Sequence, residues 1–301
     1  MNIESFSLKK RCIPLKAGRV AYYEEGTGTP IVFLHGCPFS SYIWRSVIPR
    51  LSPTFRCLAP DLLGLGDTET LRSADWSLPA QARMVTEFLD ALGLDRVNLV
   101  GHDHGGAISQ ILAAECPERI KKLVLANVEA FDNWPSADEK PFVIATQLPV
   151  LGRFVLWLWS FPRLAKLALS AGSAVYDKRV LTPELVGGFV GANLSDSHRR
   201  AKTQRFLAGQ LDKRNNNCTL GILGGLRRFN KPTMILWGKD DPHFGPKWAE
   251  RLQREIPGVK RLEIIPATGH LVMEEQPEKF ASLVLDFFLE GQDAYLMQKK
   301  G

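Results

Sequence analysis

The chain has 301 residues, of which 45% are hydrophobic and 23% charged, as expected for a globular protein that buries a large core. Its net charge is +6, and residues 153–214 carry the whole excess, with eleven Lys or Arg against four Asp or Glu. These charges alternate with apolar residues and show no aromatic pattern for stacking nucleic-acid bases, so we expect a solvated helical face, with a basic lip for anionic substrates or a membrane surface as the alternative.

The cysteines and the apolar runs indicate in which cellular compartment the protein is expected. The five cysteines are odd in number and scattered, without C-x-x-C spacing, which indicates free thiols and not a disulfide or zinc framework. Residues 1–16 contain no apolar run typical of a secretion signal. The longest apolar region, residues 143–159, is interrupted by polar residues, Pro and Gly, so no membrane span is expected. We therefore expect a cytoplasmic protein.

Apolar runs alternate with amphipathic helical patterns in the first 130 residues. Strands are expected at residues 19–25, 31–34, 55–59, 97–100 and 122–127, and helices near residues 41–51, at 78–92 and directly after 103. This alternation predicts an α/β fold in which a mostly parallel sheet is covered by helices on both faces.

The alternation stops between residues 131 and 230, where the chain reads as helical and is rich in Gly, Leu and basic residues. It resumes with elements expected at residues 233–237 (strand), 246–255 (helix), 261–265 (strand) and 277–289 (helix). We therefore expect a core domain formed by residues 1–130 and 231–301, and an inserted helical cap domain formed by residues 131–230.

The segment Gly101-His102-Asp103-His104-Gly105-Gly106 lies between an expected strand and an expected helix. This is the context of a nucleophile elbow, where small residues give a sharp turn room and a helix N-terminus faces the nucleophile. The nucleophile position holds Asp103 in place of a serine. An Asp with an ordinary pKa of about 3.9 is already ionised at neutral pH, so a histidine remains free to activate water in a second step.

Two later positions complete a triad in the chain order nucleophile, acid, histidine. Asp241 follows the expected strand at residues 233–237, and His270 follows the strand at 261–265, so both lie at carboxyl ends of strands. Asp241 would orient the imidazole of His270, which would take a proton from water. Asp240 is the neighbouring competitor for the acid position.

A third element, His35-Gly36-Cys37-Pro38, follows the expected strand at residues 31–34. The backbone N–H near Cys37 and the N–H of His104 would form an oxyanion hole. The letters His102-Asp103-His104 also suggest a metal site, but the elbow already explains the glycines and further ligands are not evident. We therefore expect neither a metal nor a cofactor.

Taken together, these motifs resemble the α/β-hydrolase superfamily, and within it the branch with an aspartate nucleophile, which includes epoxide hydrolases and haloalkane dehalogenases. The resemblance is carried by residues 35–38, 40–45, 60–67 and 101–106, by Asp241 and by Gly269-His270. It implies that Asp103 displaces a leaving group from saturated carbon to form an alkyl-enzyme ester, which water activated by His270 then hydrolyses. It also implies Glu129 as an alternative acid, because some dehalogenases place theirs after this strand.

Departures from the family pattern bear on the substrate. Haloalkane dehalogenases usually hold the halide with a Trp after the nucleophile and often an Asn after the His-Gly pair, where this chain has His104 and Cys37. Epoxide hydrolases usually use two cap tyrosines as donors to the ring oxygen. The expected cap contains one tyrosine, Tyr176, with His198 as a second candidate donor and Trp134 as a candidate for the cavity wall.

We therefore expect a cofactor-free hydrolase of a small apolar or amphiphilic substrate, with an epoxide preferred. The alternatives are haloalkane dehalogenation, hydrolysis of an ester or lactone with Asp103 as general base, and a non-catalytic ligand-binding protein on the same scaffold. No nucleic-acid partner is expected, and the sequence leaves the oligomeric state open. His243, beside the acid loop, is expected to begin a helix without a chemical role.

Overall fold

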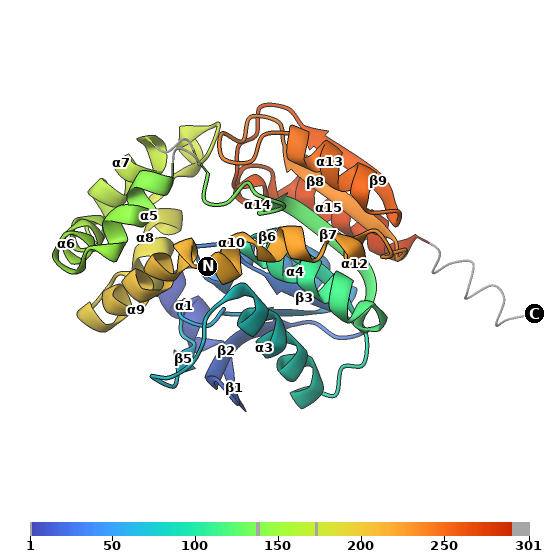
Figure 1. Cartoon of the computed structure of the whole chain (residues 1–301), viewed down its shortest axis with the longest axis horizontal. Coiled ribbons are helices and arrows are strands. Elements are labelled where there is room, and N and C mark those ends of the chain that lie inside the picture. Colours follow the sequence, from blue (N-terminus) through green and yellow to red (C-terminus); the bar gives the residue numbers. More distant parts are fainter. Residues whose placement is uncertain (1, 137–138, 172–173, 291–301) are drawn as a thin grey trace, which may run out of the picture.

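The computed structural model describes residues 2–136, 139–171 and 174–290, and a nine-stranded sheet forms its centre (Figure 1). The strands are β1 (Arg11–Leu15), β2 (Gly18–Glu25), β3 (Thr29–Leu34), β4 (Phe55–Pro60), β5 (Glu69–Thr70), β6 (Val97–Asp103), β7 (Ile120–Val128), β8 (Thr233–Gly238) and β9 (Val259–Ile265). Their order is β1-β2-β4-β3-β6-β7-β8-β9, with β5 paired to β2. Pairs that involve β2 are antiparallel, and all pairs from β4 to β9 are parallel.

Helices cover both faces of the sheet, which confirms the predicted fold class. The helices packed on it are α2 (Ile48–Leu51), α3 (Leu78–Ala91), α4 (His104–Glu115), α13 (Lys247–Glu255) and α15 (Pro277–Leu289). On β3, Ile31 and Phe33 face the layer of α2 and α15, whereas Val32 and Leu34 face α3, α4 and α13. Because alternate side chains of a strand point to opposite faces, burial of both faces explains why the central strands read as continuous apolar runs.

The sequence patterns did not predict the first helix and strand of the chain, α1 (Ile3–Leu8) and β1. Helix α1 is anchored by one fully buried residue, Phe6, whose ring stacks on Tyr23 with centroids 4.3 Å apart. Six residues with a single apolar anchor are too short to show a helical period. Strand β1 lies at the sheet edge with no residue fully buried, so it shows no strong apolar pattern either.

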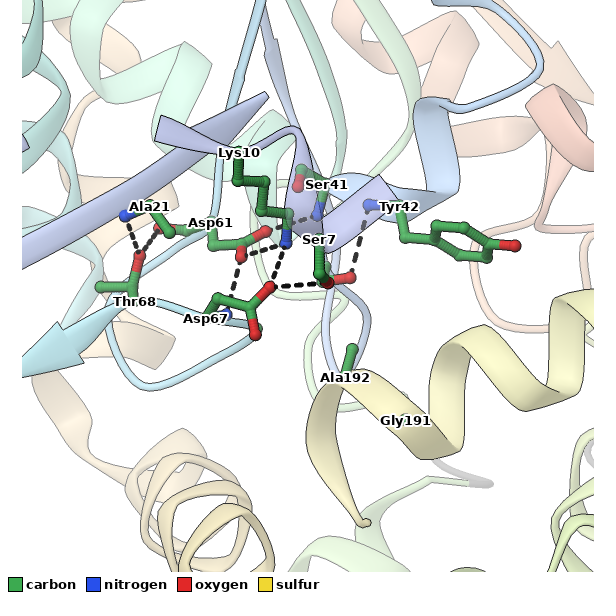
Figure 2. A network of polar contacts seen from close by, with 12 residues as sticks. Ser7, Lys10, Ala21, Ser41, Tyr42, Asp61, Asp67, Thr68, Gly191 and Ala192 are labelled. Atoms are coloured by element: carbon green, nitrogen blue, oxygen red, sulfur yellow. Dashed lines mark hydrogen bonds and ion pairs between the residues drawn. The ribbon is translucent and has the colours of Figure 1, made fainter. Parts of the chain in front are cut away.

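A buried ion cluster fastens this N-terminal segment to the sheet (Figure 2). The Nζ atom of Lys10 lies 2.6 Å from Oδ2 of Asp61 and 2.8 Å from Oδ2 of Asp67, and the Lys10 side chain is only 3% exposed. Asp61 also accepts hydrogen bonds from the N–H groups of Ser41 and Asp67. Burial alone would lower the pKa of Lys10, but the two carboxylates outweigh it and raise that pKa, so the cluster stays charged.

Between β7 and β8 the described residues form helices and no strand. They include α5 (Lys140–Gln147), α6 (Pro149–Trp159), α7 (Pro162–Ala171), α8 (Pro183–Asn193), α9 (Ser197–Ala208), α10 (Lys213–Asn216), α11 (Cys218–Gly221) and α12 (Leu223–Leu226). Helices α5 to α9 form a lobe at one end of the sheet (Figure 1). Helices α10 to α12 instead contact α3 and α4, and Leu226 is fully buried in the same cluster as Leu112.

No single helix among the described residues is long and apolar enough to cross a membrane. Helices α5 and α6 reach that length and hydropathy only as a pair, and the chain bends by 119° between them.

Candidate active site

Asp103 ends β6 directly before α4, with φ of 53° and ψ of −120°. A positive φ is uncommon for a residue with a side chain and marks a sharp turn. Missing Cβ atoms make room for this turn: a Cβ on Gly106 would lie 2.0 Å from Cγ1 of Val128, and one on Gly36 would lie 2.5 Å from Cβ of Asp103. The turn therefore has the strand, turn and helix geometry that the sequence predicts for an elbow.

Two backbone N–H groups hold one oxygen of the Asp103 carboxylate. The N–H of Cys37 donates to Oδ1 at 2.8 Å, and the N–H of His104 donates to the same oxygen at 2.5 Å. The other oxygen, Oδ2, lies 3.4 Å from Nε2 of His270. The structure therefore brings the two expected oxyanion-hole donors to Oδ1 and leaves Oδ2 facing the histidine.

Asp241 holds the far side of the His270 imidazole. Its Oδ2 lies 3.0 Å from Nδ1 of His270 and accepts a further hydrogen bond of 2.7 Å from Nδ2 of Asn127. Its Oδ1 accepts from the N–H groups of His243 and Phe244 at 2.8 and 3.0 Å. Sequence reasoning missed Asn127, whose position at the carboxyl end of β7 was the available signal. These bonds fix both Asp241 and the imidazole that it contacts.

The charges of these three side chains depend on one another. Burial alone would lower the pKa of His270, but the carboxylates of Asp241 and Asp103 outweigh it and raise that pKa well above 6.5. Burial would raise the pKa of Asp103, but the hydrogen bond and charge of His270 lower it below 3.8. At neutral pH an imidazolium therefore lies between two carboxylates.

Comparison with known proteins identifies the family of the chain. A family model described as alpha/beta hydrolase fold matches residues 29–277. The chain belongs to the α/β-hydrolase fold family. Haloalkane dehalogenase 2 of Mycobacterium bovis is 30% identical over 291 residues, which cover 94% of this chain and 96% of that protein. A soluble epoxide hydrolase of a Corynebacterium species is 27% identical over 291 residues, covering 90% and 93%.

A solved structure gives the same result at the level of the fold. The epoxide hydrolase CorEH superposes with a TM-score of 0.76 and 25% identity, covering 93% of this chain and 98% of that chain. The protein is therefore an α/β-hydrolase enzyme whose relatives include a haloalkane dehalogenase and epoxide hydrolases, which confirms the predicted family and enzyme class.

The candidate acids of the hydrolase occupy different places. Glu129 contacts His104, with its Oε2 2.9 Å from Nδ1 of that ring. Burial raises the pKa of Glu129. Asp240 is exposed and reaches the site only through its backbone, because its N–H donates to the carbonyl of Thr268. Asp241 is thus the candidate acid that contacts His270.

His102, the other histidine of the elbow, binds a backbone group. Its Nε2 donates to the carbonyl oxygen of His270 at 3.1 Å, and burial lowers the pKa of its ring to about 3. This neutral imidazole supports the loop that carries His270. Within the described residues, no group of three or more His, Cys, Asp or Glu is placed to hold a metal ion.

A cavity of about 400 Å³ opens beside Cys37 and His270. Its apolar wall comes mainly from the helical insertion and includes Phe142, Trp159, Leu169 and Phe189. Two ionisable side chains also line it, Glu139 and His243, and Nδ1 of His243 lies 3.9 Å from Oε2 of Glu139. Sequence reasoning missed Glu139 and gave His243 no chemical role. The cavity of the hydrolase is therefore apolar with one acidic group near the triad.

Three residues expected to face the substrate do not line this cavity of the hydrolase. Trp134 is buried in the core, where its Nε1 donates to Oε1 of Gln210 at 3.3 Å. Tyr176 is 57% exposed. His198 is exposed on the first turn of α9 and borders a different surface hollow. The packing of the inserted helices, which the sequence pattern does not specify, places these side chains outside the lining of the cavity.

Proposed function

We propose that the enzyme hydrolyses an epoxide in two steps, with Asp103 as the nucleophile. The observation that carries this proposal is the difference between the two oxygens of the Asp103 carboxylate: Oδ1 accepts hydrogen bonds from two backbone N–H groups, whereas among the described residues no backbone N–H donates to Oδ2. Oδ2 attacks a ring carbon, the carbon–oxygen bond of the epoxide breaks, and a 2-hydroxyalkyl ester of Asp103 forms.

Ester formation then activates the second step. An esterified Asp103 carries no charge, so one of the two carboxylates that raise the pKa of His270 is lost. The imidazolium can then release its proton to the carboxylate of Glu139, which lines the same cavity and has given up a proton during ring opening. The neutral imidazole takes a proton from water, which attacks the ester carbonyl carbon. The N–H groups of Cys37 and His104 stabilise the oxyanion on Oδ1, and Asp241 stabilises the imidazolium. Collapse of the intermediate releases a diol and the Asp103 carboxylate.

Glu139 supplies the proton that ring opening requires. Burial raises its pKa, although His243 and the hydrogen bond that the Ser136 hydroxyl donates to Oε2 oppose this rise. In its neutral form Glu139 protonates the ring oxygen as it leaves, and the proton that the His270 imidazolium then releases restores this acid. The proton taken from water regenerates the imidazolium. A halide leaves as a stable anion and needs no proton. This acid in an apolar cavity favours an epoxide substrate.

The two classes of relative support the same first step. Attack of a carboxylate on saturated carbon serves both a haloalkane dehalogenase and an epoxide hydrolase, the names carried by relatives of this chain. Carbon–halogen hydrolysis is the second candidate. It is favoured by the 30% identity to haloalkane dehalogenase 2 over 291 residues.

Intact-mass spectrometry of a His270→Gln variant tests the proposal. The variant lacks the water-activating base, so it should accumulate an Asp103 ester with 1,2-epoxyhexane, adding the whole mass of the epoxide. The matched haloalkane, 1-bromohexane, would instead add a hexyl group and release bromide. Adding Asp103→Asn should abolish both adducts. If neither compound gives an adduct while the native enzyme hydrolyses esters, the alkyl-enzyme mechanism is wrong.

The same assay isolates the part played by Glu139. In the His270→Gln background, Glu139→Gln should slow ester formation from 1,2-epoxyhexane about 100-fold, as expected for loss of a general acid. Ester formation from 1-bromohexane should be unchanged, and Glu139→Asp should restore part of the epoxide rate. An equal slowing with both compounds would show that Glu139 shapes the cavity without donating a proton.

A further inference from the structure

Helices α6 and α7 expose apolar side chains on the outer surface of the molecule. Val150 is 83% exposed and Leu167 65%, and Phe154, Trp157 and Phe161 between them are also exposed. The ring of Trp157 stacks on Phe154 and meets Phe161 edge-on, so the aromatic side chains form one continuous group. We call these five residues the outer cap face. Helix α6, which carries Val150, Phe154 and Trp157, lies at the end of the lobe remote from β8 and β9 (Figure 1).

The charged residues of helices α5, α6 and α7 are all basic. The sequence contains no Asp or Glu between residues 140 and 176, whereas it contains Lys140, Arg153, Arg163 and Lys166. All four basic residues are exposed, and none forms an ion pair with another described residue. Exposed aromatic and aliphatic residues bordered by Lys and Arg are the composition of helices that lie in the interface of an anionic lipid bilayer.

The same helices form part of the wall of the active-site cavity. Trp159, at the end of α6, and Ala168 and Leu169, on α7, line the cavity beside His270. Helices α6 and α7 thus contribute apolar residues both to the cavity that His270 lines and to the outer cap face. A lipid bilayer in contact with the outer cap face would therefore lie close to the cavity, and so would any compound dissolved in that bilayer.

We propose that the outer cap face docks on the surface of an anionic phospholipid bilayer, with α6 and α7 in the headgroup region and without a spanning helix. Charge distinguishes this occupant from a second copy of the chain. A two-fold contact through the outer cap face would bring the same basic residues of both copies together, whereas phosphatidylglycerol or another anionic lipid complements them. Docking needs no particular reaction, so it does not depend on the proposed substrate.

Vesicle co-sedimentation of the full chain tests this proposal. We expect binding to vesicles of phosphatidylglycerol and phosphatidylcholine about 100-fold tighter than to phosphatidylcholine alone, because each of several basic residues contributes near an anionic surface. The affinity should fall in 0.5 M NaCl. Phe154→Glu with Leu167→Glu should reduce binding at least about tenfold. Leu8→Glu, a matched change at an exposed leucine of α1, should not.

Circular dichroism and thermal unfolding of each variant exclude loss of folding as the cause. Equal binding to both vesicle types, or no binding to either, would overturn the proposal. So would a concentration-dependent dimer that Phe154→Glu with Leu167→Glu disrupts in the absence of vesicle binding, because the occupant would then be a second copy.

Discussion

Oδ2 of Asp103 and Nε2 of His270 lie 3.4 Å apart, although 166 residues separate them in the chain. This ion pair can exist only while the carboxylate is free, because an ester carries no charge. The pair therefore couples the charge of His270 to the progress of the proposed reaction. In the free enzyme the imidazole is held as a cation, and in the ester it becomes available as a base.

A pH titration should detect this coupling. Replacing Asp103 by Asn mimics the neutral ester, so the pKa of His270 should be lower in Asp103→Asn than in the native enzyme, where two carboxylates raise it well above 6.5. NMR titration of the imidazole C–H resonances, assigned with His270→Gln, measures both values. An unchanged pKa would mean that Asp241 alone sets the charge of His270.

Two conservative substitutions distinguish the candidate acids. Asp241 contacts His270, so Asp241→Asn should slow hydrolysis of the ester on the order of 10⁴-fold and let the ester accumulate. Glu129 contacts His104, so Glu129→Gln should leave that step within about threefold of native. Stopped-flow mixing with quench and intact-mass analysis follows the ester. Accumulation in the Glu129 variant instead would transfer the acid role to Glu129.

Asn193 of α8 joins the helical insertion to the oxyanion turn. Its Oδ1 accepts from the N–H of Gly66, and its Nδ2 donates to the carbonyl oxygens of Pro38 and Phe39 at 2.9 and 3.2 Å. Because these bonds position the turn that carries the Cys37 N–H, Asn193→Ala should slow ester hydrolysis between about 10- and 100-fold.

Single-turnover rates and a matched control show whether this effect is specific. Ester formation should slow less than ester hydrolysis, since the oxyanion develops fully only in the second step. Asn217→Ala, a change at an exposed asparagine, should leave both rates unchanged. Equal slowing of both steps would assign Asn193 a general structural role.

The sequence allowed the proximity of Asp103, Asp241 and His270 to be predicted, because each lies at or shortly after the end of an apolar strand and parallel strands bring their carboxyl ends to one edge of the sheet. Asp103 ends β6, and Asp241 and His270 follow β8 and β9. Glu139 does not lie at the end of a strand, so the strand pattern could not predict its position. It begins an inserted helix, and its neighbour His243 lies about 100 residues further on, so only tertiary packing brings the two together.

Dependence on tertiary packing also explains why Tyr176 and His198 were expected to face the substrate but do not line the cavity. Tyr176 and His198 have suitable chemistry, but the direction in which an inserted helix or loop points depends on how it packs on its neighbours. Helical periodicity identifies a buried face without identifying what that face contacts. Sequence therefore predicts the reaction centre of this enzyme better than its substrate cavity.

The Lys10 cluster gives a stability prediction that is independent of catalysis (Figure 2). Lys10→Met keeps the length of the side chain but leaves Asp61, which is fully buried, without its cation. The free energy of unfolding should fall by about 3 kcal/mol, because breaking a buried pair leaves an uncompensated charge. Lys16→Met removes a lysine that is 90% exposed and lies 3.5 Å from Glu87, so it should cost less than about 0.5 kcal/mol. Urea unfolding followed by tryptophan fluorescence measures both values, and similar losses in the two variants would show that the buried cluster contributes no more than a surface pair.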